Sequence, residues 1–375
     1  MFTKKKILVL CTSDNMVTQF LLPHIKFMED AGNTIEIACG KSGYWFNDLV
    51  KMGYTVHELP CSRSVFTKKN IKAFLMLEKI VKEKKYDLIY CQQAIGGMRG
   101  RLIGKKYKIP VIYTAHGFSF FKGCSFKSKL LYKTAEKYFA KFTDVLVTIN
   151  DEDFEAAKKM KKDNVFKVSG IGYDPKKYQN QLSHAEARKM LSIKDDEILV
   201  CTIAEYIKRK NYKTMLKTMA KLPKNIKFIA CGTGVLFDEM KKYVKKLHIE
   251  DRVFLAGYRK DVNNVLAASD IFFLPSYSEG LTLSIIEAMN FGLPVVTSDV
   301  RGNRDLIENG KGGYVCGAND SDKFAESIMT LANNSELRKQ FGEYNKSQCD
   351  KYTLEKVLKQ LEEVYSHIHF NDKAN

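Results

Sequence analysis

The chain has 375 residues, of which 45% are apolar and 28% are charged, and its formal net charge is +18. This length suits two domains better than one, and the composition is typical of a soluble globular protein. No apolar run reaches the ~18 residues that span a bilayer, and the first apolar run, 7–11, is too short for a signal peptide. We therefore expect a cytoplasmic protein.

The cysteines and the charge distribution restrict the kinds of site and partner that the protein can have. The nine cysteines form no C-x-x-C pair and have no histidine cluster nearby, which argues against disulfides and zinc. Residues 1–150 hold 25 Lys and Arg against 11 Asp and Glu, a net charge of +14, which leaves +4 for the rest. A basic half of this kind attracts nucleic acid, an anionic membrane or an anionic substrate, and charge alone does not choose among them.

The first half of the chain alternates short apolar runs with longer amphipathic ones. The runs KKILVLC, TIEIAC, YTVHEL, DLIYC, PVIYTA and DVLVTI predict strands. Amphipathic segments between them predict helices at 17–30, 44–52, 70–84 and 96–106. Strand and helix in alternation indicate parallel βαβ units in a doubly wound sheet.

The pattern restarts after a joining stretch at 170–178. EILVCTIA, IKFIACG, RVFLAG, DIFFL, PVVTS and GGYVC predict strands, with helices at 211–222, 235–247, 262–267, 282–291 and from 320. We therefore predict an α/β protein of two Rossmann-like domains, with the active site in the cleft between them. The amphipathic tail 354–368 follows no strand of its own.

The stretch 271–297 contains the clearest candidate site. An apolar strand ends at Pro275, a polar loop carries Glu279, and a helix that contains Glu287 follows. Such a helix start favours a phosphate, so two carboxylates flank a predicted anion site. Two plainer interpretations are open from spacing alone: Glu287 can form a capping box with Ser284, and Glu279 can be a solvated loop acid.

The letters E-G-L-T-L-S-I-I-E followed by A-M-N-F-G-L-P-V-V-T resemble the E-x7-E signature of retaining glycosyltransferases of family 4, and V-R-G-N-R-D-L-I extends the match. The resemblance implies the GT-B fold, whose last helix crosses back to the first domain. It implies an acceptor-side domain at 1–174, joined by 354–375, and a nucleotide-sugar domain at 175–353.

The resemblance also implies donor contacts in the second domain. Lys210 matches a family lysine that binds the diphosphate, whereas Glu205 stands where an arginine is usual. We therefore expect either that Glu205 turns away from the diphosphate or that Arg209 supplies the missing positive charge. The alternative is that 208–210 form a solvated turn. Further predicted donor contacts are Glu287 on the ribose, and Gly232, Gly234, Tyr258, Arg259, Gly280, Leu281, Thr282 and Leu283.

A lone G-x-G at 232–234 is weak evidence for close approach of a ligand to the backbone. The loop 257–262 resembles the one that holds the nucleotide base, but it also fits a plain exposed turn.

In the first domain, H-G-F at 116–118 ends a strand and resembles the family histidine that contacts the donor sugar, although a lone histidine is usually structural. Catalytic roles are therefore predicted for Glu279, His116 and Lys210. The loop 11–16 has Thr-Ser-Asp-Asn where many relatives carry Gly-Gly. Predicted acceptor-side residues are Asn15, Gly96 and Gly97.

These features predict a retaining transferase that uses a nucleotide-diphosphate sugar, most simply a UDP-sugar, and a lipid-linked saccharide acceptor in surface polysaccharide synthesis. We assign no D-x-D-type metal pair to the cleft loops, so we expect no metal and no cofactor. Alternatives are a GT-B sugar-nucleotide epimerase, a regulatory module that binds sugar nucleotide without turnover, and a basic nucleic-acid-binding protein; no RNA-binding motif supports the last.

The segment 118–142 interleaves aromatic residues with lysines 122, 127, 129, 133, 137 and 141. From Ser128 onward an apolar stripe is predicted beside four of these lysines, made of Leu130, Leu131, Tyr132, Tyr138 and Phe139. We expect this surface to hold the enzyme on the anionic inner face of the cell membrane. The alternative is an ordinary helix with its apolar side in the core and a solvated lysine face.

Overall fold

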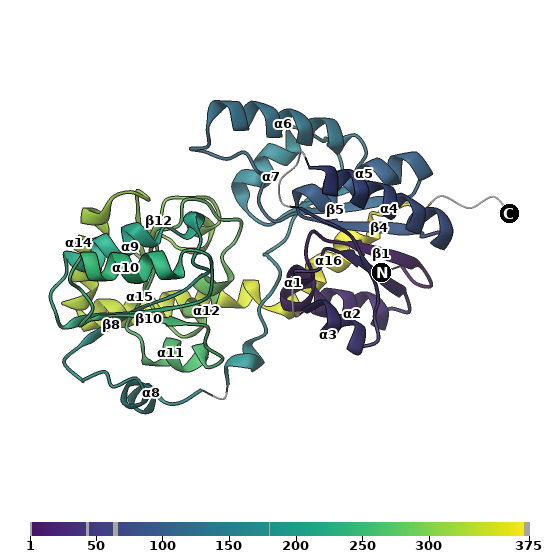
Figure 1. The fold of residues 1–375 in the computed structure, drawn as a ribbon. Coiled ribbons are helices and arrows are strands. Elements are labelled where there is room, and N and C mark those ends of the chain that lie inside the picture. Colours follow the sequence, from purple (N-terminus) through teal and green to yellow (C-terminus); the bar gives the residue numbers. More distant parts are fainter. Residues whose placement is uncertain (1, 43–44, 63–66, 180, 371–375) are drawn as a thin grey trace. The chain divides into compact units, whose positions relative to one another are not determined.

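The computed structural model describes residues 2–42, 45–62, 67–179 and 181–370. The chain divides into two compact units, unit 1 with residues 1–172 and 354–375, and unit 2 with residues 173–353. Figure 1 shows the yellow C-terminal helix lying among the purple and blue elements of unit 1. The last helix thus belongs to the first unit, as the GT-B resemblance implies.

Unit 1 is built on a seven-stranded sheet in the order β3-β2-β1-β4-β5-β6-β7, and every described pair of neighbouring strands is parallel. Its strands are β1 (Lys6–Leu10), β2 (Thr34–Cys39), β3 (Thr55–Glu58), β4 (Leu88–Gln92), β5 (Val111–Ala115), β6 (Val145–Thr148) and β7 (Val165–Lys167). The central strands β4, β5 and β6 are buried along their whole length, as expected for a parallel sheet covered on both faces.

The helices of unit 1 connect these strands. They are α1 (Asp14–Met16), the π-helical turn η1 (Val17–Leu21), α2 (Leu22–Asp30), α3 (Trp45–Lys51), α4 (Lys68–Lys84), α5 (Ala94–Tyr107), α6 (Phe126–Ala140), α7 (Asp151–Lys158) and α16 (Leu354–Ser366). Helix α5 contacts both α4 and α6, and α16 contacts α2. The helix that the sequence predicts over 44–52 is observed from Trp45; Tyr44 lies outside the described residues.

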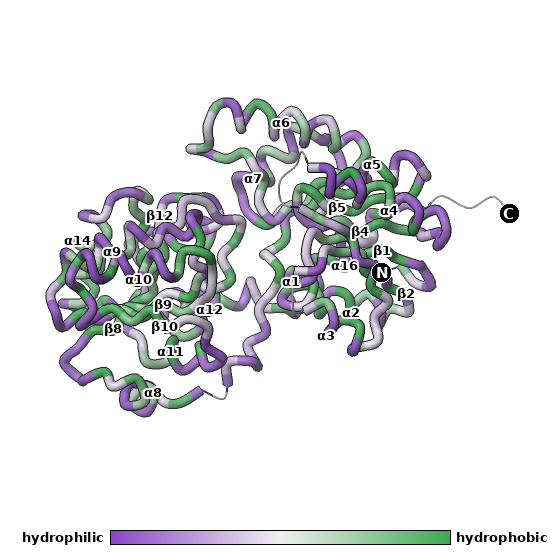
Figure 2. The backbone as a smooth tube through the Cα atoms, in the orientation of Figure 1, coloured by the Kyte–Doolittle hydropathy of each residue, from purple (hydrophilic) through white to green (hydrophobic). Residues whose placement is uncertain are grey.

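Unit 2 has a six-stranded sheet in the order β10-β9-β8-β11-β12-β13, whose neighbours also pair in parallel. Its strands are β8 (Ile198–Ile203), β9 (Ile226–Cys231), β10 (Val253–Gly257), β11 (Ile271–Leu274), β12 (Val295–Ser298) and β13 (Gly313–Cys316). Figure 2 shows hydrophobic colouring along β8 and β9, in keeping with their place in the core.

The helices of unit 2 alternate with its strands up to β13, after which two more helices follow. They are η2 (Pro175–Tyr178), α8 (His184–Met190), η3 (Lys208–Lys210), α9 (Tyr212–Ala220), α10 (Phe237–Lys246), α11 (Val262–Ala268), α12 (Leu283–Asn290), α13 (Asn303–Leu306), α14 (Ser321–Ala332), α15 (Ser335–Gln348) and η4 (Cys349–Tyr352). Helix α12 contacts α13, α15, η4 and β12.

The observed architecture confirms the predicted fold class of two parallel-sheet α/β domains. The cysteines that end apolar runs are buried, and all nine cysteines are free thiols. In the part of the chain that the structure describes, no helix is long and apolar enough to cross a membrane.

Candidate active site

The loop between β11 and α12 is shaped by a strand that stops at Pro275 and a helix that starts without a side-chain cap. Thr282, the N-cap residue, has extended backbone angles, and its hydroxyl donates to Asn303 Oδ1 at 2.8 Å instead of capping the helix. The amide groups at the start of α12 are therefore left without a side-chain cap, and the positive end of the helix dipole favours an anion there.

Glu279 lies in this loop and is buried against two cations. The Lys210 ammonium donates to Glu279 Oε1 at 2.7 Å, and the Arg209 guanidinium contacts Oε2. Lys210 is buried, whereas Arg209 is partly exposed. The structure contradicts the interpretation of Glu279 as a solvated loop acid, and it contradicts the solvated-turn interpretation for Lys210.

The ionisation of Glu279 follows from these partners. Burial alone would raise the pKa of Glu279, but the charges of Lys210 and Arg209 outweigh burial and lower it. The carboxylate therefore carries its charge at neutral pH. Two cations around one carboxylate leave a net positive charge at this edge of unit 2.

Backbone contacts bring the cations to the loop. β8 and β11 are neighbours in the sheet, so the segments after their carboxyl ends meet at one edge. The Tyr277 N–H donates to the Arg209 carbonyl at 2.8 Å, and the Asn211 amide donates to the Pro275 carbonyl at 2.9 Å. On the other side, Arg301 Nε donates to the Glu279 carbonyl at 3.0 Å.

Glu205, which stands where the family resemblance places an arginine, is exposed. Arg209 approaches the site from the same loop and contacts Glu279, which supplies a second positive charge beside Lys210.

Glu287 lies inside α12 and does not cap it. The Tyr178 hydroxyl donates to Glu287 Oε1 at 2.6 Å, and the N-cap position belongs to Thr282. The capping-box alternative with Ser284 is therefore wrong. Burial raises the pKa of Glu287 to about 6, although the bond from Tyr178 and the charge of Lys177 both lower it.

The glycine-rich turn 232–234 is explained by packing within the protein. A Cβ atom at Gly232 would come within 2.0 Å of the Ala204 carbonyl oxygen, and one at Gly234 would come within 2.5 Å of the Tyr206 carbonyl oxygen. Both residues also have positive φ angles, 151° and 153°. Close packing against the loop after β8 thus gives a structural reason for these glycines, and their contact with the donor stays a prediction.

Gly280 packs in the same close manner against the start of α13. A Cβ atom at Gly302 would lie 2.1 Å from the Gly280 carbonyl oxygen. Leu281 and Leu283 flank the N-cap residue Thr282 and are half-buried.

The loop after β10 is exposed. The Tyr258 side chain is exposed, and the Arg259 guanidinium pairs with the Asp261 carboxylate through contacts of 2.9 and 2.5 Å. This pairing lowers the pKa of Asp261. The prediction that this loop holds the base stays a prediction.

His116 follows β5 in unit 1 and lies next to a buried glutamine. His116 Nε2 and Gln92 Oε1 are 2.6 Å apart, which fits an imidazole that donates from Nε2. Burial and the nearby His24 lower the pKa of His116 to about 3. A neutral His116 with Nε2–H keeps Nδ1 as an acceptor.

The predicted acceptor-side residues lie at the carboxyl edge of the same sheet. Asn15 belongs to α1, directly after β1, and its N–H donates to Asp14 Oδ1 at 2.8 Å. Gly96 and Gly97 lie in the first turn of α5, which begins at Ala94, two residues before the helix predicted at 96–106. A Cβ atom at Gly96 would meet the Leu10 carbonyl oxygen at 3.2 Å, and one at Gly97 would meet the Tyr113 ring at 2.3 Å.

The structure thus gathers Glu279, Lys210 and Arg209 within unit 2 and places Glu287 further along α12 with a different partner. His116, Asn15, Gly96 and Gly97 belong to unit 1. Sequence reasoning missed Tyr178 and Gln92, because each acquires its role only through a contact between segments far apart in the chain.

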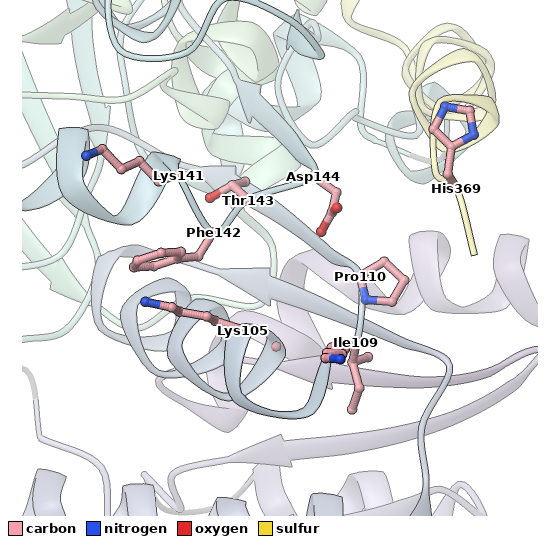
Figure 3. Close-up of a pocket in the computed structure, with 10 residues that line it drawn as sticks. Lys105, Ile109, Pro110, Lys141, Phe142, Thr143, Asp144 and His369 are labelled. Atoms are coloured by element: carbon pink, nitrogen blue, oxygen red, sulfur yellow. The ribbon is translucent and has the colours of Figure 1, made fainter. Parts of the chain in front are cut away.

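A cavity of about 230 Å³ lies elsewhere in unit 1, at the amino ends of β5 and β6 (Figure 3). Lys105 and Lys141 line it together with Phe142, and the Asp144 carboxylate there accepts the Val111 N–H at 2.7 Å. His116 follows the carboxyl end of β5, so this cavity and His116 lie at opposite edges of the sheet of unit 1.

Comparisons with known proteins identify the family of this chain. The family model "Glycosyl transferases group 1" matches residues 183–348, and the model "Glycosyl transferase 4-like" matches residues 6–150. Together the two models reach across both units. The Bacillus subtilis protein EpsD is 27% identical over 374 residues, which is 96% of each chain.

An Escherichia coli relative, UDP-Gal:alpha-D-GlcNAc-diphosphoundecaprenol alpha-1,3-galactosyltransferase, is 29% identical over 331 residues, 84% of this chain and 83% of its own. The crystal structure of Anabaena Alr3699/HepE in complex with UDP and glucose matches with a TM-score of 0.81 at 19% identity, over 97% of this chain and all of that one. The chain therefore belongs to the glycosyltransferases with a GT-B fold.

Proposed function

We propose that this glycosyltransferase moves a sugar, with retention of configuration, from a UDP-sugar to a lipid-linked saccharide in surface polysaccharide synthesis. The observation that carries the proposal is the cluster of Lys210, Arg209 and Glu279 beside the uncapped start of α12. Its net positive charge suits a diphosphate. The E. coli relative, named for UDP-Gal and a diphosphoundecaprenol acceptor, supports the same donor and acceptor classes.

In this proposal Glu287 accepts hydrogen bonds from the ribose diol, as an acid does in dinucleotide-binding folds. Lys210, Arg209 and the start of α12 hold the diphosphate. Glu279 and His116 orient the donor sugar, for which His116 offers its Nδ1 acceptor.

The reaction breaks the bond between the anomeric carbon and the diphosphate oxygen. A bond then forms between that carbon and an acceptor hydroxyl on the same face, and the hydroxyl proton goes to the departing phosphate oxygen. Negative charge grows on the diphosphate as it leaves, and fixed positive groups stabilise it most at that moment. We propose that Lys210 and the helix dipole do this without a metal ion.

The test is a mass-spectrometric screen of donor consumption over UDP- and GDP-sugars, with and without lipid-linked acceptors. The proposal expects consumption of a UDP-sugar only when acceptor is present, and NMR of the product should show the anomeric configuration of the donor. Inversion of that configuration would overturn the retaining mechanism.

The same screen separates the alternatives. An epimerase would convert the donor with no acceptor present, and a regulatory module would bind sugar nucleotide without consuming it. The relatives named as glycosyltransferases support transfer over both alternatives.

We also propose that unit 1 holds the enzyme on the anionic inner face of the cell membrane. On α6, Leu130 and Leu131 are 61% and 51% exposed, and Phe126 and Tyr138 are exposed as well. The core-facing alternative is therefore wrong for these side chains, whereas Tyr132 packs against the core and Phe139 is half-buried, so these two members of the predicted stripe are not exposed. Exposed Lys129, Lys133, Lys137 and Lys141 lie beside them, and Figure 2 shows hydrophobic and hydrophilic colouring interleaved along α6.

Helix α4 carries a second exposed apolar face that sequence reasoning did not single out. Ile71 and Leu75, one turn apart, are 65% and 59% exposed, with Lys72 exposed beside them. Glu78 of α4 pairs with Lys106 of α5, and Arg101 of α5 pairs with Glu136 of α6 at 2.8 Å. These pairs tie α4 and α6 to the helix between them, which supports one shared membrane-facing surface.

A further inference from the structure

Tyr178 contacts the site residue Glu287, although the two residues are far apart in the chain. It lies in η2, more than a hundred residues before α12 in the chain, and its hydroxyl donates to Glu287 Oε1 at 2.6 Å. A tyrosine hydroxyl has one proton to donate, so a short bond to a carboxylate fixes both partners.

The protein holds the Tyr178 ring in place. The ring packs edge-on against Phe291 with centroids 6.0 Å apart, and it lies 6.2 Å from the ring of Tyr173. The Asn263 amide of α11 donates to the Lys177 carbonyl at 2.8 Å, and Asp174 caps η2 by accepting the Lys176 N–H at 3.0 Å. The hydroxyl is therefore presented to α12 by a fixed turn.

We infer that Tyr178 is a positioning residue: its hydroxyl holds one oxygen of Glu287 so that the other oxygen faces the ribose diol of the nucleotide. The inference rests on the proposed ribose role of Glu287. A carboxylate accepts through both oxygens, so a bond to Oε1 orients Oε2 without using it. The ribose diol is common to uridine and guanosine, so the inference does not depend on the base.

Two neighbouring groups affect the ionisation of Glu287, whose side chain is half-buried. The hydrogen bond from Tyr178 and the charge of Lys177, both from η2, lower its pKa. On the other elements packed against α12, Asp305 of α13 accepts the Gly302 N–H, Cys349 of η4 donates to the Ile286 carbonyl, and Tyr344 of α15 donates to Glu308. A change at Tyr178 should therefore reach Glu287 directly.

The sign of the pH effect follows. Ribose hydroxyls donate to an ionised Glu287, so nucleoside affinity is full above the pKa of Glu287, about 6, and falls as pH drops through it. The bond from Tyr178 lowers that pKa. Its removal should raise the pKa of Glu287 and move the midpoint of the affinity profile to higher pH.

The experiment measures uridine binding by calorimetry across pH 5 to 8, with guanosine in parallel, on the full chain. Uridine has no phosphate to titrate. Tyr178→Phe should move the midpoint upward and weaken uridine binding about fivefold at neutral pH. The matched control is Tyr173→Phe, since the Tyr173 hydroxyl contacts Asn290 of the same helix, at 3.4 Å, and should leave the profile unchanged.

A double variant separates positioning from general loss of structure. If Tyr178 acts through Glu287, adding Tyr178→Phe to Glu287→Gln should cost nothing more in uridine affinity. A full additional loss, or an unshifted midpoint in Tyr178→Phe, overturns the inference while the ribose role stands. Unchanged uridine affinity in folded Glu287→Ala overturns the ribose role itself, and the inference with it.

Discussion

Glu279 and Glu287 belong to one sequence signature, yet their surroundings push their ionisation in opposite directions. Both lose water on burial, which by itself raises a carboxyl pKa. Glu279 meets Lys210 and Arg209, which lower its pKa, whereas Glu287 meets a neutral hydroxyl and keeps a pKa raised to about 6. Two acids with different neighbours are thus suited to different tasks, and the partners decide which task each can perform.

The largest effect on this difference between Glu279 and Glu287 is expected from removing the buried ammonium group of Lys210. Lys210→Ala should lower the free energy of unfolding by about 3 kcal/mol, because it removes the buried partner of a buried carboxylate. It should also impair UDP-sugar turnover and barely change uridine binding, since the proposed contact is with phosphate. Chemical denaturation and steady-state kinetics measure the two effects.

The neighbouring exposed Lys208 supplies the matched control for that variant. Lys208→Ala should change neither stability nor turnover. If uridine binding falls as far as UDP-sugar use in Lys210→Ala, then Lys210 does not serve the phosphate.

A second test changes the two side chains that are proposed to orient the donor sugar. Glu279→Gln and His116→Ala should each reduce kcat about 100-fold, because a misplaced donor sugar loses its aligned geometry, while nucleotide affinity changes little. His116 has a pKa of about 3, so its charge state should not change between pH 5 and 8. Parallel measurement of kcat and UDP affinity decides the assignment, and equal losses in both would contradict it.

A third test addresses Glu287. Glu287→Ala should weaken UDP binding by about 2 kcal/mol, because a hydrogen bond to a charged acceptor is lost, and Glu287→Gln should lose less. In the wild-type protein the contribution is present above pH 6 and declines below it, since the raised pKa makes protonation easy. In Glu287→Ala, uridine affinity should no longer decline below pH 6, which uridine titrations at pH 5 and 7.5 would reveal.

The smallest effects per residue are expected at the exposed lysines of α6, in contrast to the buried Lys210. Each contributes about 1 kcal/mol to binding an anionic bilayer. Reversal of Lys129, Lys133, Lys137 and Lys141 to Glu should release the protein from anionic vesicles and leave UDP binding intact. Co-sedimentation at low and high salt measures this, since screening acts within ~8 Å at physiological ionic strength.

Replacement of exposed apolar residues by serine tests the two helices of the proposed surface separately. Leu130→Ser with Leu131→Ser on α6, and Ile71→Ser with Leu75→Ser on α4, should each weaken vesicle binding. Binding that ignores salt, or that needs no anionic lipid, would favour a soluble acceptor instead.

Much of the fold could be predicted from the sequence, because parallel strands in a covered sheet are continuous apolar runs. The strand Ile271–Leu274 and the helix after it appear where the apolar pattern places them. The short helices α7 and α8, and the long helix α15, were not predicted. The buried residues of α15 are Phe341, Gly342 and Asn345, and Phe341 alone is large and apolar, so the hydrophobic periodicity of this helix is weak.

The sequence predicts which residues form the site better than it predicts the contacts between them. The signature indicated Glu279, Glu287 and Lys210, but not that Glu279 is buried between two cations or that Tyr178 holds Glu287. Spacing along the chain also left open the capping box at Ser284. The N-cap position of Thr282 and the hydrogen bond from Tyr178 to Glu287 exclude that alternative.

The discontinuity of unit 1 has a consequence for biosynthesis. The chain leaves this unit at Gly172 and returns at Leu354, where the two passages touch so closely that a Cβ atom at Gly172 would lie 2.7 Å from the Leu354 Cα. Helix α16 then buries Val357, Leu361, Val364 and Tyr365, and Gln360 accepts the Ser169 N–H at 2.8 Å. On the ribosome, unit 2 has all its residues before unit 1 does, although unit 1 is begun first. The first unit to be translated should therefore be the last to become fully stable, and until α16 emerges its surface at α2 is open to chaperones and proteases.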